Sequence, residues 1–404
     1  MSILMDDQSV AQRILEHIEH DTTDLGQSVW REPVDNYRSE ERMAAEVELA
    51  FRRSPTPYCP SAALPDVGSY VARDAGGTPI LTVRTHDGTV RAFRNACRHR
   101  GTQLADGSGC AKAFVCPYHG WTYNLAGRLC GVPHEYGFPG LDKELHGLAP
   151  LSVEERFGLV FVTQGEPFIR DESLDHLPEL IAPEQQLLAM RESEIEANWK
   201  IMLEGFLEGY HIRSTHRETF YPYGFDNLNL VEIFGRNSRV TYPFRRIAKL
   251  AETPPEDRRV EGLLTYVYHL FPNVLVTVLS HHTNVIVLEP VALDRTKLIT
   301  YTLTNRGSST LELRDTVERD AEFVDQTGAA EDRAVIRAIQ RGLGSGANDV
   351  FTFGLFESAI VHFHRSLDAV LEQRAVQVRP HRKDCENDKK DRITHRTTSM
   401  ESPR

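Results

Sequence analysis

The spacing of apolar residues in the first half of the chain changes from a helical period to an alternating one. Residues 8–20 and 39–53 place apolar side chains three to four positions apart, which predicts two helices, the second opened by Ser39 as N-cap. After Gly68 the period becomes two, and the turn signals Gly76-Gly77 and Asp87-Gly88 separate short strand-like runs. This pattern predicts a small β-domain.

The second half of the chain predicts a larger sheet closed by helices. A passage rich in proline and acidic residues, with a short helix near 179–190, leads into it. Six strand-like runs follow, at 228–235, 237–246, 262–271, 274–281, 283–291 and 297–305. The last four indicate an antiparallel meander. Long helical patterns at 311–343 and 350–374 come next, and strands followed by helices indicate an α+β fold.

These patterns divide the chain into four predicted parts. They are an N-terminal helical segment (1–44), a small β-domain (45–165), a larger domain (166–378) and a polar tail (379–404) predicted to be disordered. The run GLGSG at 342–346 follows a helix rather than a strand. We interpret it as a helix C-cap and turn, not as a nucleotide-binding loop.

Composition narrows the class of protein. A length of 404 residues allows two or three domains, and a net charge of −12 argues against a nucleic-acid surface. We find no apolar run of the ~18–20 residues that a membrane span needs, and the first residues lack the pattern of a secretory signal. The six cysteines are dispersed, which favours a reduced, cytoplasmic setting over a disulfide framework.

The stretch from Cys97 to His119 carries the first candidate chemistry. Its pattern is C-x-H-x16-C-x2-H, formed by Cys97, His99, Cys116 and His119. Two thiolates and two imidazoles on two short loops suit a [2Fe–2S] cluster in which cysteines hold one iron and histidines the other. A structural zinc site uses the same residue types but usually opens with two cysteines. The spacing therefore favours the cluster, with zinc as the alternative.

A second constellation follows at 198–216. Glu208 and His211 would share a helical face, but His211 and His216 would point about 140° apart on a regular helix. They can hold one metal ion only if the helix ends or bulges near residues 213–215. Spacing alone does not separate such a site from two structural histidines, and a third ligand would have to come from elsewhere.

Both constellations resemble those of the Rieske family. Arg100-Gly101 and Gly120-Trp121 beside the cluster residues are similar to its oxygenase branch. Asn198-Trp199-Lys200, followed by Glu208, His211 and His216, resembles the NWK…(D/E)-x2-H-x4-H pattern of that branch, and residues 331–343 resemble its E-D-x7-Q-R-G-L stretch. The resemblance covers roughly residues 37–375.

The resemblance implies two cofactors. One is a Rieske [2Fe–2S] cluster on Cys97, His99, Cys116 and His119. The other is a mononuclear non-haem Fe(II) on His211, His216 and Asp332, an arrangement that leaves positions open for dioxygen and substrate. Asp332 is preferred over its neighbours Glu331, Asp325 and Asp320. Glu208 is expected to link His211 of one subunit to His119 of the next in a homotrimer, with a helix-grip (START-like) catalytic domain beside each Rieske domain.

The implied activity is that of an oxygenase component. The chain has no Rossmann or flavin fingerprint, so electrons for O2 would come from a separate reductase or ferredoxin. A small aromatic substrate is slightly favoured. The alternative is a quaternary-ammonium or N-methyl compound, because members acting on such compounds include those with glutamate at the position of Glu208. Tyr221, Tyr223 and Phe225 could form a cage for such a cation, stack on an aromatic ring or fill the core. Outside enzymes, the alternative is a non-catalytic electron-transfer or zinc-binding protein.

Overall fold

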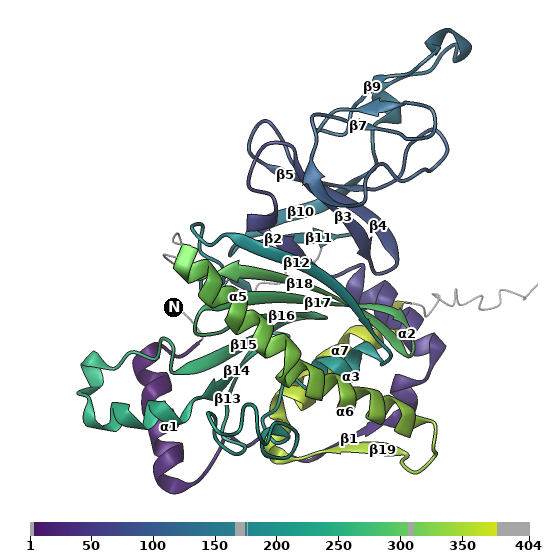
Figure 1. Cartoon of the computed structure of the whole chain (residues 1–404). Helices are drawn as coiled ribbons and strands as arrows, with labels where there is room; N and C mark the ends of the chain where they lie inside the picture. Colours follow the sequence, from purple (N-terminus) through teal and green to yellow (C-terminus); the bar gives the residue numbers. More distant parts are fainter. Residues whose placement is uncertain (1–3, 166–173, 176, 306–310, 378–404) are drawn as a thin grey trace, which may run out of the picture.

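The computed structural model describes residues 4–165, 174–175, 177–305 and 311–377. It confirms the α+β prediction, with two seven-stranded sheets, each in its own part of the molecule (Figure 1). The smaller sheet meets the larger one where β2 (Thr56–Pro60) contacts β17 (His282–Ala292). Within the described residues, no helix combines the length and apolar character that crossing a membrane requires.

The smaller sheet has the strand order β2-β11-β10-β5-β4-β3-β6. Its strands are β2 (Thr56–Pro60), β3 (Ser69–Ala75), β4 (Thr78–Arg84), β5 (Val90–Arg94), β6 (Gly107–Cys110), β10 (Pro150–Arg156) and β11 (Leu159–Thr163). A three-stranded sheet of β7 (Phe114–Val115), β8 (Thr122–Tyr123) and β9 (Leu129–Gly131) extends from it. The hairpin between β3 and β4 turns at Gly76 and Gly77, both with positive φ, as a tight two-residue turn requires.

The larger sheet is antiparallel, in the order β12-β18-β17-β16-β15-β14-β13. Its strands are β12 (Leu187–Ile195), β13 (Leu230–Phe234), β14 (Asn237–Pro243), β15 (Leu264–Leu270), β16 (Val274–Val278), β17 (His282–Ala292) and β18 (Arg295–Thr304). The associated helices are α3 (Trp199–Glu204), α4 (Ile212–Thr215), α5 (Leu311–Gln326), α6 (Gly328–Leu343) and α7 (Ser358–Gln377). Figure 1 shows α5 and α6 crossing in front of the strands. The six predicted strands are confirmed.

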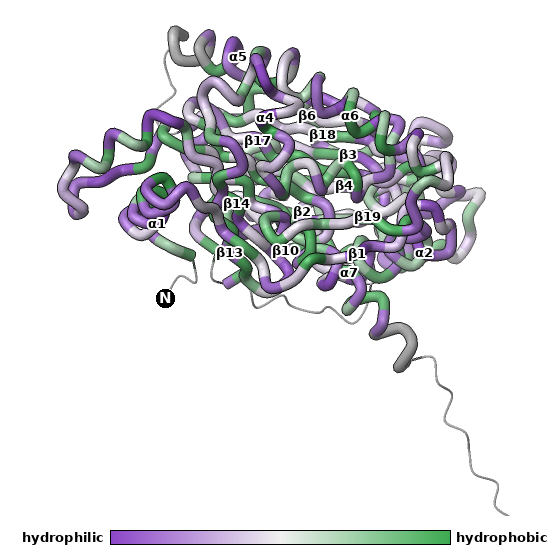
Figure 2. Tube along the Cα trace, turned by 90° about the horizontal axis from the view of Figure 1, so that it is seen from below, coloured by the Kyte–Doolittle hydropathy of each residue, from purple (hydrophilic) through white to green (hydrophobic). Residues whose placement is uncertain are grey.

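The N-terminal segment packs against the domain that contains the larger sheet. Helix α1 (Asp7–His20) buries Val10, Ala11 and Ile14. Strand β1 (Trp30–Pro33) pairs with β19 (Val350–Phe353), and Figure 2 shows both beside α7 and α2 (Glu40–Glu46). Ser39 caps α2 as predicted. A π-helical turn follows at Val47–Phe51, and 3-10 turns span Val34–Tyr37, Ser61–Ala63, Glu135–Gly137, Glu144–His146, Arg245–Glu252, Pro255–Asp257 and Leu355–Glu357.

Several predicted elements differ from the structure. The helix near 179–190 is wrong, because β12 begins at Leu187; this edge strand exposes a run of polar residues and so lacks an alternating pattern. The predicted helix over 311–343 is divided at Thr327 into α5 and α6. Residues 350–353 are β19 rather than the start of a helix. The helical segment at the N-terminus also contains β1. The turn after α6 is confirmed, with Gly344 as C-cap, and the predicted tail lies outside the described residues.

Candidate metal centres

The two loops that carry the cluster residues have the same backbone hydrogen bonds. In each, the cysteine amide donates to a carbonyl five residues ahead and the cysteine carbonyl accepts from a glycine four residues ahead. These bonds, of 2.8–3.0 Å, run from Cys97 to Thr102 and Gly101 to Cys97, and from Cys116 to Trp121 and Gly120 to Cys116. Both glycines have positive φ, 79° and 73°, which favours glycine. The sequence therefore builds two matching turns.

The side chains on these turns form a set of two thiols and two imidazoles. Cys97 and Cys116 are buried, whereas His119 is exposed and His99 half-buried. The Nδ1 atoms of the two histidines lie 3.1 Å apart. Desolvation, His119 and Arg100 lower the pKa of His99, which favours the neutral imidazole that binds metal. Inner sulfur and outer nitrogen donors fit a Rieske cluster.

Neighbouring groups support the donors. Desolvation opposes ionisation of Cys116, but hydrogen bonds from the amides of Tyr118 and His119 lower the pKa of its thiol. The Tyr123 hydroxyl lies 3.3 Å from Cys97 Sγ and accepts the amide of Arg98 at 2.9 Å. Such hydrogen bonds favour the thiolate form that ligates iron.

The second site begins where α3 ends. Glu208 lies in the loop between α3 and α4, so it does not share a helical face with His211. His211 directly precedes the short α4, and His216 directly follows it. The Glu208 carboxylate accepts from the His211 amide at 3.1 Å, and it also contacts His211 Nδ1 and the amide of Tyr210. The early helix end removes the obstacle posed by the five-residue spacing of the histidines.

His211, His216 and Asp332 converge. One ligand atom from each lies within 4.8 Å of the others. Asp332 Oδ1, on α6, is 2.9 Å from His216 Nε2 and 3.6 Å from His211 Nε2. Two imidazoles and one carboxylate whose ligand atoms lie this close together fit the two-histidine, one-carboxylate set of non-haem Fe(II).

The other candidate carboxylates lie elsewhere. Asp320 Oδ2 is 3.0 Å from Nδ1 of His282, a buried histidine at the start of β17. Glu331 Oε2 is 2.8 Å from His216 Nδ1, on the far side of that ring from Asp332. The side chain of Asp325 is outside the described part of the chain. Of the described candidates, Asp332 is therefore the carboxylate that joins both histidines.

Each histidine of this site has a carboxylate at Nδ1, Glu208 for His211 and Glu331 for His216. A carboxylate oxygen can only accept, so each of these contacts favours a proton on Nδ1. Desolvation works against the protonated ring, but hydrogen bonds with Glu208 and Asp332 raise the pKa of His211 and His216 respectively. A metal ion that binds to one of these rings must displace a proton from its nitrogen.

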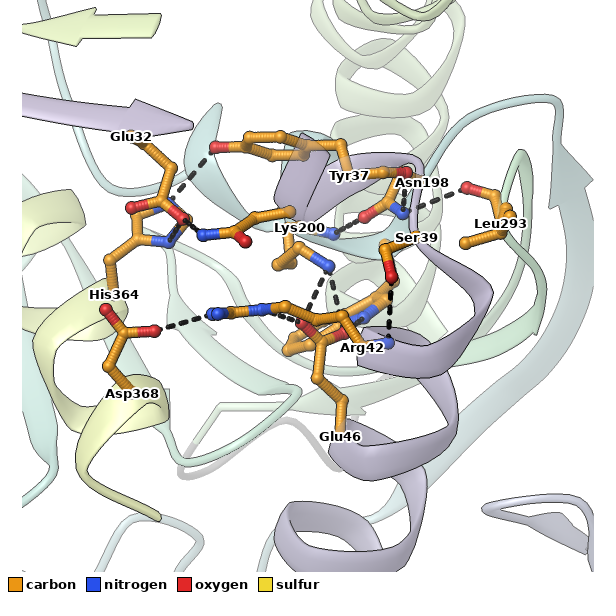
Figure 3. Close-up of polar contacts among 12 residues, drawn as sticks. Glu32, Tyr37, Ser39, Arg42, Glu46, Asn198, Lys200, Leu293, His364 and Asp368 are labelled. Atoms are coloured by element: carbon orange, nitrogen blue, oxygen red, sulfur yellow. Dashed lines mark hydrogen bonds and ion pairs between the residues drawn. The ribbon is translucent and has the colours of Figure 1, made fainter. Parts of the chain in front are cut away.

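The Asn-Trp-Lys motif anchors the ligand-bearing segment (Figure 3). Asn198 caps α3 by accepting from the Lys200 amide at 3.0 Å, and its Nδ2 donates to the carbonyl of Tyr37. Trp199 Nε1 and Lys200 Nζ both donate to the fully buried carboxylate of Glu46, at 3.0 and 2.9 Å. Glu46 was missed in the sequence, because nothing local marks it as the partner of a motif so far along the chain.

A second buried cluster holds the end of α3. Glu204 Oε1 accepts from the Tyr37 hydroxyl at 2.7 Å and from His364 Nε2 at 2.9 Å. His364 Nδ1 lies 3.4 Å from Glu32. The N-terminal segment, α3 and α7 are thus joined through charged groups just before Glu208.

Of the three aromatic residues that could form a substrate cage, two lie against a cation of the protein itself and the third is exposed. The Arg245 guanidinium lies 5.1 Å from the Tyr221 ring centroid and 5.5 Å from that of Phe225, while Tyr223 is exposed. Phe220, not singled out in the sequence, has its ring 4.8 Å from that of His216. Its ring packs so closely on Gly328 that a Cβ there would lie 2.0 Å from it.

The β-domain carries two loops with two cysteines and two histidines, and the sheet-and-helix domain carries a two-histidine, one-carboxylate site. Together these two sites define the class of Rieske non-haem iron proteins. The comparisons agree. Residues 54–141 match the Rieske [2Fe–2S] domain family, and residues 184–373 match the catalytic domain of ring-hydroxylating alpha subunits. The chain belongs to the Rieske non-haem iron oxygenases, as an oxygenase (alpha) subunit, and its cofactors are a Rieske [2Fe–2S] cluster and a mononuclear iron.

Three relatives are oxygenase subunits of glycine betaine or carnitine monooxygenases. The glycine betaine monooxygenase oxygenase subunit of Chromohalobacter salexigens is 38% identical over 38% of this chain and 36% of its own length. The carnitine monooxygenase oxygenase subunit of Acinetobacter pittii is 34% identical over 46% and 53%. That of Escherichia coli K12 is 27% identical over 86% and 95%. The matched region thus spans about a third to a half of the first two relatives.

Two solved structures have the same fold as this chain. The quaternary ammonium Rieske monooxygenase CntA superposes with a TM-score of 0.72 at 25% identity, over 85% of this chain and 95% of that one. Naphthalene 1,2-dioxygenase has a TM-score of 0.69 at 19% identity, over 84% and 92%, which shows the shared fold alone. The relatives favour the quaternary-ammonium alternative over the aromatic substrate that the sequence slightly favoured.

Proposed function

We propose that this protein is the oxygenase component of a multicomponent monooxygenase that oxidises a small N-methylated, quaternary ammonium compound. It would use O2 and electrons from a separate reductase or ferredoxin. The observation that carries the proposal is the convergence of His211, His216 and Asp332 within 4.8 Å, in a chain that also holds the Cys97, His99, Cys116 and His119 set.

The chain's residues have distinct roles in this proposal. His211, His216 and Asp332 would hold the ferrous ion, which supplies the site for activating dioxygen. Glu208 accepts the Nδ1 proton of His211 and keeps its Nε2 directed at the metal position. The four residues on the two matching loops would hold the cluster, which delivers electrons singly.

The proposed reaction is a monooxygenation. One atom of dioxygen enters a C–H bond on a carbon next to the ammonium nitrogen. The other atom leaves as water, using two electrons from the reductase and two protons. The hydroxylated cation can then release its hydroxyl proton and break its C–N bond, giving an aldehyde and a tertiary amine.

The surroundings of the site support a cationic substrate. A quaternary ammonium group has no hydrogen-bond donor, so anionic and aromatic groups must recognise it. Beside the ligands lies the carboxyl of Glu357, which interacts electrostatically with Glu208, Glu204 and His211; burial raises its pKa to about 7, and a cation bound nearby would favour its ionised form. The Phe220 ring lies against His216. The names of the relatives point to the same substrate class.

We also propose a homotrimer. Figure 1 places β7 and β9, which accompany the cluster loops, at the opposite end of the molecule from α6. Electron transfer within one chain would have to cross this separation. A head-to-tail ring would instead bring the cluster of one subunit to the iron of its neighbour, with Glu208 between His211 and His119 of the neighbouring subunit.

Oxygen uptake tests the substrate class. Purified protein with both cofactors is mixed with a surrogate reductase and NADH. Carnitine, glycine betaine and choline are compared with benzoate and other aromatic acids, and amine or aldehyde release is measured with oxygen consumption. We expect coupled turnover with a methylated ammonium compound. Coupled turnover with aromatic acids alone would refute that substrate class, and absence of iron would refute the oxygenase itself.

A further inference from the structure

Glu331 precedes Asp332 on α6, and the two carboxylates flank one histidine. Asp332 Oδ1 lies 2.9 Å from His216 Nε2, and Glu331 Oε2 lies 2.8 Å from His216 Nδ1. Successive residues on a helix point about 100° apart, so one helix can supply a carboxylate to each ring nitrogen. Glu331 Oε2 also accepts from the Thr219 hydroxyl at 2.7 Å.

We propose that Glu331 is a positioning residue for the mononuclear iron: its carboxylate accepts a hydrogen bond from Nδ1–H of His216 and so orients the ring with Nε2 toward the metal position. Carboxylate partners of this kind typically change metal affinity by about 10–100-fold. The inference rests on the proposed function, because it assumes that His216 is a ligand. It extends that function by assigning Glu331 a role other than that of a ligand.

Glu331 differs from Glu208 in what else it contacts. Glu208 bonds the amides beside His211 and is proposed to reach a neighbouring subunit, so a change there combines two effects. The second contact of Glu331 is Thr219, within the same chain. A change at Glu331 therefore affects metal retention without removing the proposed route between subunits.

The local structure has other supports that should let Glu331 variants fold. Phe220 packs directly on Gly328, which holds the loop after His216 against the first turn of α6. Glu331 itself is about one-third exposed, with a side-chain exposure of 34%, so its loss leaves no large buried cavity. His216, in contrast, is 2% exposed and would keep an unpaired Nδ1.

Competition with a chromogenic ferrous chelator tests the proposal in the full-length protein with its cluster intact. We expect Glu331→Ala to weaken ferrous-ion affinity by about 10–100-fold. Glu331→Gln should recover part of that loss, since its amide oxygen still accepts from Nδ1. Thr219→Val, which removes the other bond of Glu331, should remain near wild type. Cluster absorbance, measured in the same samples, should be equal in all four proteins.

Two results would overturn the positioning role. Wild-type affinity in Glu331→Ala would show that His216 needs no partner at Nδ1. Complete loss of iron from both Glu331 variants would show that Glu331 is itself a ligand. Failure of the wild-type protein to bind ferrous ion would instead refute the proposed function on which this role depends.

Discussion

The cluster loops and the iron site differ in how far the chain must fold to assemble them. Both cluster turns lie within Cys97 to His119, and each is shaped by hydrogen bonds among a few consecutive residues. The iron site joins the segment after α3 to a carboxylate on α6, and its position depends on Glu46 and Tyr37 from the N-terminal segment. The first site is set by local backbone geometry and the second by the packing of the whole larger domain.

This difference predicts that substitutions in the larger domain should release the mononuclear iron and leave the cluster in place. The cluster loops have their own apolar core, which includes Phe114, Trp121 and Leu129. The iron-site anchors belong to another core, which includes Trp199, Ile336 and Phe363. Changes in the second core should therefore release iron while the cluster remains.

Asp332→Ala should have the largest effect, because it removes the carboxylate that joins both histidines. We expect loss of mononuclear iron, and a fall in turnover beyond the roughly 100-fold that loss of an outer partner costs. Iron analysis and the visible spectrum measure the two cofactors separately. Asp320→Ala is the matched control, since Asp320 pairs with His282, and it should retain iron. Full iron content in Asp332→Ala would place the third ligand elsewhere.

Glu46→Ala should destabilise the larger domain through the anchor of α3. It leaves Lys200 buried without its carboxylate partner, a change that costs about 3–5 kcal/mol. We expect a lower thermal unfolding temperature and loss of iron before loss of cluster absorbance. Asp368→Ala removes a partly exposed partner of Arg42 and should cost about 0–1 kcal/mol. Simultaneous loss of both cofactors in Glu46→Ala would contradict the separation.

Glu208→Gln tests the proposed connection between the two sites. The substitution keeps the size of the side chain but removes a charge-assisted hydrogen bond worth about 1.5–3 kcal/mol. We expect both metals to stay bound and product formation to fall by roughly 10–100-fold, with slower reoxidation of the reduced cluster. Stopped-flow absorbance and product assays measure the two steps. Unchanged product formation would reject the bridging role.

The smallest effect is expected from alanine substitutions of the two glycines in the cluster turns, Gly101 and Gly120. An alanine at positive φ costs roughly 1–2 kcal/mol. At Gly101 a Cβ would meet nothing within 4 Å, but at Gly120 it would lie 3.1 Å from Pro133 Cγ. Gly120→Ala should therefore lose its cluster at a lower temperature than Gly101→Ala, with the content of mononuclear iron unchanged in both. Equal behaviour would mean that backbone strain alone limits these turns.

The sequence predicted best what is local. The hairpins at Gly76-Gly77 and Asp87-Gly88 and the positions of the cluster residues depend on neighbours in the chain, so their patterns are visible there. The sequence predicts a helix at β19, since its partner strand β1 is at the other end of the described chain. It also predicts a helix at the start of β12, because this strand lies at a sheet edge with polar residues facing solvent.

The iron site was predictable only in part. The spacing of His211 and His216 left a metal site undecided, and Asp332 was selected by its resemblance to a family stretch. What the pattern could not give was the end of α3, which turns the segment before Glu208, or the carboxylate at His216 Nδ1. Both depend on contacts with α6 and the N-terminal segment, and no spacing within one segment encodes them.

The pairing of β1 with β19 limits how the protein can be divided. The catalytic-domain match begins at residue 184, yet Glu32, Tyr37 and Glu46, which supply buried partners to His364, Glu204 and Lys200, come from the opposite side of the Rieske domain in the chain. A fragment cut at the family boundaries would expose the edge of β19, leave the buried Lys200 without its carboxylate partner and remove the contacts of Glu204 with Tyr37 and of His364 with Glu32. Any excised catalytic unit must therefore carry residues 30–51 with it, supplied in the same chain or as a complementing peptide.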